Sequence, residues 1–205
     1  MNFIISILSY SLLGEAYRSE DVPIPFVPYP TNPHTGAPVK TKLKPMERRS
    51  DLRYGAPMAD PITGLHAPIL AVTIHPQTGA VLPIAGTHTD PVTGLPIAIE
   101  MGSLMVDPAT NDPVPILGVT LDCSTGETVP IGGSRETGGG RGRGQAGPVA
   151  LMPGDVYVEP MSGQPARIAS AFLSDNEVLP ASGGYLAMLD ANMLACEARA
   201  LDCLR

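Results

Sequence analysis

Asp90-Pro-Val-Thr-Gly94 is one copy of a pentapeptide that returns along this chain of 205 residues. Four related copies begin at Asp60, His75, Asp107 and Asp122, and their fifth residues are Gly64, Gly79, Asn111 and Gly126. The five starts are 15, 15, 17 and 15 residues apart. An Ile follows each fifth residue by five positions, and in four of the five copies a Pro stands just before it. The recurrence predicts a fold built from a repeated unit.

The residue types of the pentapeptide are those of a tight turn. Asp accepts backbone N–H bonds from residues further along the turn, Pro presets φ, Thr adds a hydroxyl bond, and Gly or Asn takes the left-handed conformation. On either side apolar residues alternate with smaller ones, as in Leu70, Val72 and Ile74, which indicates half-buried strands. Each unit of about 15 residues, DPxTGxxxPI, is therefore predicted to be a β-hairpin.

The Pro that precedes the recurring Ile limits how the hairpins are joined. Proline cannot donate to a strand ladder, so a strand should end, kink or lie at an edge there. We therefore expect hairpins hinged at Pro-Ile rather than a flat meander. Because one hairpin is marginal in water, the hairpins should stack on a shared core. The predicted fold is mainly β: stacked short β-hairpin repeats, disordered Pro/Gly-rich segments and a C-terminal α-helix.

Composition and the repeat pattern divide the chain into six segments. We expect an apolar N-terminal segment at residues 1–20, a Pro-rich and then basic flexible arm at 21–53, the β-hairpin repeat region at 54–133, a Gly/Arg-rich linker at 134–149, degenerate hairpin repeats at 150–183, and an amphipathic helix at 184–205.

The apolar run within residues 1–20 has two interpretations. Residues 3–13 are apolar and are followed by the small residues that a signal peptidase prefers, but no Lys or Arg precedes the run. Either residues 1–16 are a cleaved signal peptide or the segment is a short buried strand or helix. The run is too short to span a bilayer, and we predict no transmembrane span.

The last segment carries an apolar stripe with the spacing of a coiled-coil seam. Its members are Leu186, Leu189, Met193, Cys196, Ala200 and Cys203. This stripe either packs on its own domain or forms a homo-oligomer, in which the two cysteines would lie at the seam. The helix reaches Arg205 without a C-cap, so we expect a product shorter than the natural helix.

Charge points to a protein partner. The net charge is −7, which argues against a general nucleic-acid binder. Six basic residues nevertheless fall within fourteen positions, and they are the candidate partner-binding residues: Lys40, Lys42, Lys44, Arg48, Arg49 and Arg53. They suit an acidic surface, whether of a protein, a nucleic acid or a lipid; the alternative is that this stretch is a solvated linker.

Chemical motifs are weak throughout. Gly142-Arg-Gly144-Gln-Ala-Gly147 matches a dinucleotide fingerprint in letters only, because Pro148 follows at once and no strand is expected before it. Each turn offers a single Asp, fewer ligands than a calcium loop needs. The Cys and His residues show no metal spacing, and no nucleophile and base are brought together. We expect no enzyme activity, no catalytic residue, no metal and no cofactor.

The sequence thus predicts a non-enzymatic structural or scaffolding repeat protein that mediates protein–protein interaction, in a cytoplasmic, cytoskeletal or ciliary setting. One alternative is a secreted, extracellular-matrix type of repeat protein, if residues 1–16 are removed. A second is an RNA-associated protein acting through residues 40–53 and the Arg-Gly tract at 138–144.

Overall fold

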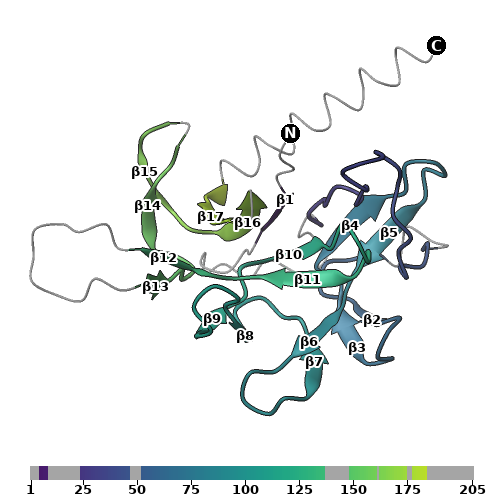
Figure 1. Cartoon of the computed structure of the whole chain (residues 1–205), viewed down its shortest axis with the longest axis horizontal. Coiled ribbons are helices and arrows are strands. Elements are labelled where there is room, and N and C mark those ends of the chain that lie inside the picture. Colours follow the sequence, from purple (N-terminus) through teal and green to yellow (C-terminus); the bar gives the residue numbers. More distant parts are fainter. Residues whose placement is uncertain are drawn as a thin grey trace, which may run out of the picture.

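Short antiparallel hairpins make up the protein. The computed structural model describes residues 5–8, 24–46, 52–136, 148–160, 162–174 and 177–183. The strands are β1 Ile5–Leu8, β2 Pro57–Ala59, β3 His66–Pro68, β4 Ala71–Ile74, β5 Val81–Ile84, β6 Thr87–Thr89, β7 Pro96–Ala98, β8 Leu104–Val106, β9 Pro113–Pro115, β10 Gly118–Leu121, β11 Thr128–Ile131, β12 Ser134–Glu136, β13 Pro148–Ala150, β14 Val156–Val158, β15 Pro165–Arg167, β16 Ser170–Ser174 and β17 Glu177–Ala181. Figure 1 shows them as a series of hairpins that point in different directions rather than as one large sheet.

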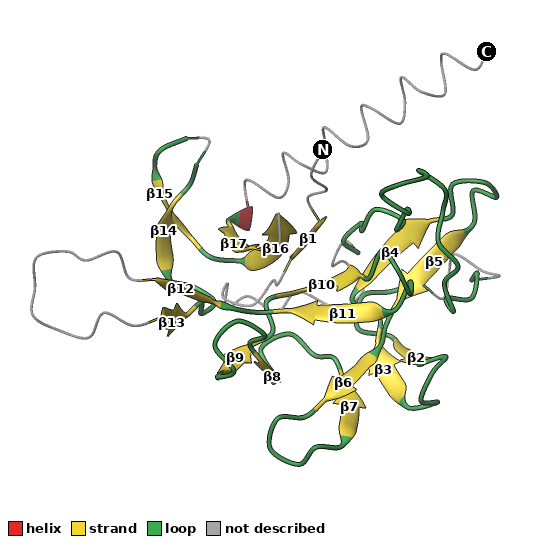
Figure 2. Cartoon of the chain, viewed as in Figure 1, coloured by secondary structure: helices red, strands yellow, loops and turns green. Residues whose placement is uncertain are grey.

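The strands pair in sequence order. From β2 to β17 each even-numbered strand pairs with the strand that follows it, and β1 adds to β16 to give a three-stranded sheet. The remaining described sheets have two strands each. Figure 2 shows the strands as short segments joined by loops of comparable length. The mainly β prediction is confirmed for the described residues, whereas the helix expected at residues 184–205 lies outside them.

The pentapeptides form the hairpin loops. In the β6–β7 loop the N–H of Gly94 donates to the carbonyl of Asp90 over 2.9 Å, and Gly94 has a φ of 68°. The Asp90 carboxylate accepts N–H bonds from Val92 and Thr93 and a bond from the Thr93 hydroxyl. Asn111 takes the same left-handed conformation in its loop, with a φ of 62°. The side chain of the first residue thus closes the loop that the fifth residue turns.

The Ile that follows each loop is a core residue. Ile84, Ile99 and Ile116 are completely buried, and Ile69 and Ile131 are 1% exposed. Ile84, Ile99 and Ile116 belong to one apolar cluster, to which Leu70, Val114 and Val119 also contribute. Ile131 and Ile168 belong to a second cluster nearer the C-terminus. The Ile side chains therefore connect hairpins that share no strand pairing.

In two hairpins a proline stands opposite a residue whose backbone pairs with a further segment on its other side. Pro83 pairs with Val72 across the β4–β5 hairpin and has no N–H to donate. Val72 instead donates its N–H to the Pro25 carbonyl and accepts a bond from the Val27 N–H, each over 2.8 Å. The hairpins β4–β5, β10–β11 and β16–β17 have strands of four or five residues and are here called the long hairpins. The third of them has a similar arrangement, because Ala171 pairs with Pro180 on one side and with Ile7 of β1 on the other. Two N-terminal stretches thus pair with the outer edges of β4 and β16, the strands that lie opposite the prolines.

The same hydrogen bond closes the open end of three hairpins, β2–β3, β8–β9 and β14–β15. The N–H groups of Gly55, Gly102 and Gly154 each donate over 2.8 Å, to the carbonyls of Ile69, Ile116 and Ile168 respectively. All three glycines have positive φ, between 76° and 85°. The turn at Gly102 lies between the Asp90 and Asp107 loops, which explains why that one spacing is 17 rather than 15 residues.

We predict that Ile116→Ala lowers the free energy of unfolding by about 2–5 kcal/mol, because it removes a fully buried side chain and leaves a cavity. Val92→Ala is the matched control, since Val92 is 82% exposed at a loop tip and its truncation should cost less than about 0.5 kcal/mol. Urea unfolding followed by circular dichroism measures both. Equal losses for the two variants would contradict the assignment of the Ile positions to the core.

We predict that removing residues 1–16 lowers the midpoint of thermal unfolding and speeds hydrogen exchange in β16. The reason is that the register Ile5↔Leu173 to Leu8↔Ser170 disappears and leaves the edge of β16 unpaired. Exchange in β4, whose outer side is covered by residues 25–27, is the internal control. If β16 exchanges equally fast with and without residues 1–16, the pairing of β1 contributes nothing to stability.

Acid should destabilise the fold through the turn carboxylates. Burial raises the pKa of Asp60, but the Thr63 and Thr87 hydroxyls and the Ile62 and Thr63 amides lower it by more, and the pKa lies below its ordinary value. A carboxyl whose pKa is lower in the folded state gives stability that is present above its unfolded pKa, about 3.9, and is lost as the pH falls through the folded pKa.

We therefore predict that the free energy of unfolding falls as the pH is lowered from about 5 to about 3, and falls less steeply in Asp60→Asn. The variant will be less stable at pH 7, because an amide has a single acceptor oxygen. Urea unfolding at each pH gives both slopes. Identical slopes would show that Asp60 does not contribute to the pH dependence.

Candidate binding site between the N-terminal segment and hairpin β4–β5

Residues 24–46, here called the N-terminal segment, are anchored on the hairpins at several points. Val27 is completely buried, and Leu43 packs against the first apolar cluster. The Tyr29 hydroxyl donates to the Val39 carbonyl over 3.1 Å, and the Met46 N–H donates to the Val81 carbonyl over 3.3 Å. A pentapeptide-like loop starts at Asn32, whose carbonyl accepts the Gly36 N–H over 2.8 Å.

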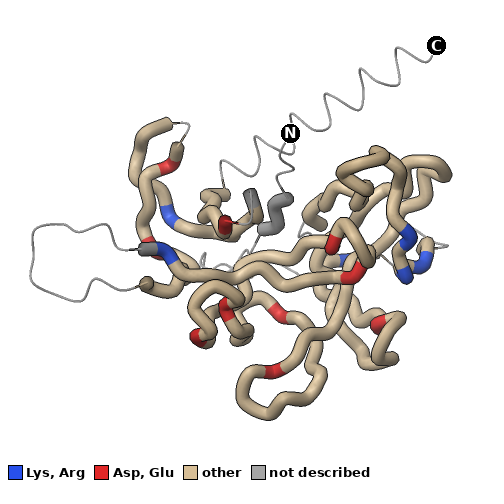
Figure 3. The backbone as a smooth tube through the Cα atoms, in the orientation of Figure 1, with Lys and Arg blue, Asp and Glu red and all other residues tan. Residues whose placement is uncertain are grey.

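Exposure alternates along residues 40–44. Lys40, Lys42 and Lys44, here called the lysine row, are exposed, whereas Thr41 and Leu43 are half-buried. This alternation is what an extended backbone produces. In Figure 3 basic residues gather at this side of the molecule, while acidic residues are spread over the hairpins. The row is therefore a local positive feature on a protein with a net charge of −7.

The row passes close to the β10–β11 loop. Lys42 forms an ion pair with Glu127 over 3.1 Å, and both side chains are about half exposed. A Cβ on Gly126 would lie 2.7 Å from the Lys40 carbonyl, so only glycine allows the segment to pass so near. Gly126 also needs its φ of 72° for the loop. One glycine thus serves both the turn and the position of the lysine row.

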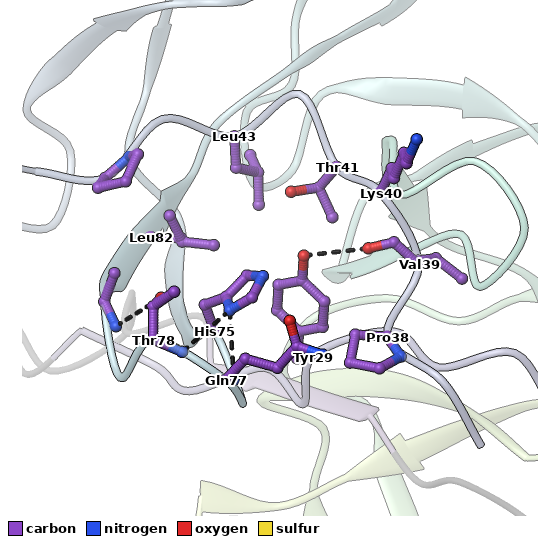
Figure 4. Close-up of a pocket in the computed structure, with 12 residues that line it drawn as sticks. Tyr29, Pro38, Val39, Lys40, Thr41, Leu43, His75, Gln77, Thr78 and Leu82 are labelled. Atoms are coloured by element: carbon purple, nitrogen blue, oxygen red, sulfur yellow. Dashed lines mark hydrogen bonds between the residues drawn. The ribbon is translucent and has the colours of Figure 1, made fainter.

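A cavity of about 600 Å³ lies between the N-terminal segment and hairpin β4–β5 (Figure 4). Its walls come from Tyr29, Thr41 and Leu43 on one side and from His75, Thr78 and Leu82 on the other. The volume is within the range of sites for small ligands, about 300–1,000 Å³. Most of the wall is apolar, with a few polar groups directed into the same space, which is the usual composition of a binding site.

His75 holds the loop and also faces the cavity. Its Nδ1 accepts the N–H groups of Gln77 and Thr78, each over 3.3 Å, as the carboxylate does in the Asp loops. Because Nδ1 acts as acceptor, the ring proton lies on Nε2. The His75 and Tyr29 rings meet edge to face, with centroids 4.9 Å apart and planes at 71°. Figure 4 shows the second ring nitrogen directed toward the interior of the cavity.

The structure brings only some of the predicted site residues together. Lys40, Lys42 and Lys44 lie along one exposed side, Arg53 is exposed next to the start of the hairpins, and Arg48 and Arg49 lie outside the described residues. The seam residues Leu186, Leu189, Met193, Cys196, Ala200 and Cys203 also lie outside them. The turn residues at positions 60, 64, 75, 79, 90, 94, 107, 111, 122 and 126 occupy the tips of different hairpins and do not converge on one site.

Sequence reasoning missed the meeting of Tyr29 and His75. A signal was available, because His75 is the one residue that takes the place of an acid among the loops between β2 and β11. In the ranges that the structure describes, no group of three or more His, Cys, Asp or Glu side chains is placed to hold a metal ion. No helix within these ranges has the length and apolar character needed to cross a bilayer.

Comparison with known proteins adds no relative. The chain matches no protein-family model, and neither a curated protein nor a solved structure is significantly similar to it.

Proposed function

We propose that the protein is a non-enzymatic scaffold that binds an acidic surface of a partner protein through the lysine row. The observation that carries the proposal is that residues between and after these lysines are anchored: Leu43 packs against the core, and the Met46 N–H donates to the Val81 carbonyl. The three ammonium groups therefore project from a backbone that is held in place. Such preorganisation reduces the entropy lost when a partner binds.

The fold suits a scaffold if its hairpins form a repeated array. Three observations support that reading: the equivalent bonds of Gly55, Gly102 and Gly154, the buried Ile positions, and the recurring loop chemistry. We propose that two short hairpins followed by a long one are the repeated element, as in β6–β11 and β12–β17, so that stacked elements bury a common core. An array of this kind offers an extended surface with short, separate binding segments.

We predict that the wild-type protein binds immobilised poly-glutamate and that the affinity falls as salt is raised, because exposed charges are screened. Lys40→Gln/Lys42→Gln/Lys44→Gln should bind at least about tenfold more weakly, since it loses three attractive charges. Lys40→Arg/Lys42→Arg/Lys44→Arg keeps the charges and should bind as the wild type does. Surface plasmon resonance over a salt series measures all three proteins.

A second control is Arg135→Gln, an exposed cation on strand β12. It should leave the affinity for poly-glutamate within about twofold of the wild-type value, because it lies outside the lysine row. If the glutamine triple variant binds as tightly as the wild type, or if Arg135→Gln weakens binding equally, the lysine row is not the binding surface.

A further inference from the structure

The cavity is chemically divided. Leu43 and Leu82 form an apolar part, and Leu82 is 3% exposed. The polar part holds the Thr41 hydroxyl, the Nε2–H of His75 and the Tyr29 hydroxyl, which Figure 4 shows directed toward the same space. The Tyr29 proton is already donated to Val39, so of these three groups Thr41 and His75 have hydrogens left for a ligand.

The polar part therefore suits a group that accepts hydrogen bonds. A carboxylate has two oxygens and no proton to donate, so one oxygen can accept from His75 and the other from Thr41. Hydrogen bonds to a charged acceptor are also stronger than bonds to a neutral one. Lys40 lies at the edge of the cavity and adds a positive charge. No described acidic side chain lines the cavity to oppose an anion.

The position of His75 is fixed from two sides. Its Nδ1 is held by the amides of Gln77 and Thr78, and its ring is held by the edge of Tyr29. An Asp at this place would close the loop equally well, as Asp90 does with Val92 and Thr93. Loop closure alone thus does not require a histidine, whereas an aspartate would bring no hydrogen-bond donor to the cavity.

We propose that the cavity binds a carboxylate attached to an apolar group. The carboxylate lies against His75 and Thr41, and the apolar group packs on Leu43 and Leu82. Two sources share this chemistry, a free aliphatic acid and the C-terminal residue of a polypeptide. The inference concerns the cavity and not the lysine row, so it can fail while the proposed scaffold function stands, and the reverse also holds.

The test uses the full chain and two matched pairs of probes. Octanoate and octanamide differ only in the charge of the head group, as do acetyl-Ala-Ala-Leu and its C-terminal amide. Isothermal titration calorimetry gives the affinities, and methyl NMR of Leu43 and Leu82 locates the binding. We expect at least one carboxylate to bind about tenfold or more tightly than its amide and to shift the resonances of both leucines.

His75→Asp is the decisive variant, because it keeps a loop-closing acceptor and places a negative charge where the donor was. We expect it to lose the carboxylate affinity while its melting temperature and its affinity for poly-glutamate stay close to those of the wild type. Thr41→Val, which removes the hydroxyl with little change of shape, should weaken binding several-fold. His75→Asn, with its neutral amide, should fall between the wild type and His75→Asp.

The outcomes separate the possibilities. Binding of both acids supports the inference and indicates a site for apolar acids in general, whereas binding of the peptide alone identifies a polypeptide C-terminus as the source. Binding of octanoate alone identifies a free acid. The inference is overturned if neither acid binds more tightly than its amide, or if His75→Asp keeps the wild-type affinity.

Discussion

The hydrogen bond that closes each pentapeptide loop is the constraint on which the rest of the structure depends. It joins the N–H of the fifth residue to the carbonyl of the first, as between Gly94 and Asp90, and it requires a left-handed fifth residue. With the loop closed, the flanking strands run antiparallel for only three or four residues. Hairpins this short are not stable alone, so their stability has to come from the Ile side chains that pack between them.

The loops and the core positions could be predicted because the information for each lies within about ten residues. Asp90, Thr93 and Gly94 have side chains or backbone freedom that act on their own turn. Ile99 lies at a fixed distance beyond that turn, and its burial follows from the same register. The spacing of 17 was visible too, but the turn at Gly102 that causes it has no Asp or Pro to mark it.

The contacts of the N-terminal segment could not be predicted, because the sequence pattern around each partner does not indicate which distant residues it will meet. Phe26 bridges Val72, and Tyr29 meets His75, across some 46 residues of chain in each case. A Pro-rich stretch has no alternating apolar signal, and the sequence therefore favoured a flexible arm. What fixes its place is the outward N–H and C=O of Val72, which forms a non-hydrogen-bonded pair with Pro83 in the hairpin. The cavity depends on this pairing, so the sequence could not predict it either.

The position of the N-terminal segment also has a reason in the way the long hairpins meet their neighbours. A Cβ on Gly86 would lie 2.7 Å from the Thr128 side chain, and one on Gly133 would lie 3.0 Å from Val178. Thr128 and Val178 face Leu121 and Leu173 in their hairpins, as Val81 faces Ile74 in the first long hairpin. Thr128 is thus covered by Gly86, which follows β5, and Val178 is covered by Gly133, which follows β11.

In the described residues no long hairpin precedes β4–β5, and the Val81 carbonyl accepts the Met46 N–H. The N-terminal segment therefore occupies, on the first long hairpin, the side that an earlier long hairpin occupies on the next two. In the repeated array that we propose, this segment would be a terminal element, and such elements generally need a polar outer face. The alternation of Leu43 inward with Lys42 and Lys44 outward provides such a face. The lysine row and the covering residues Thr41 and Leu43 thus alternate along the same extended backbone, and the cavity lies beside both, with Lys40 at its edge.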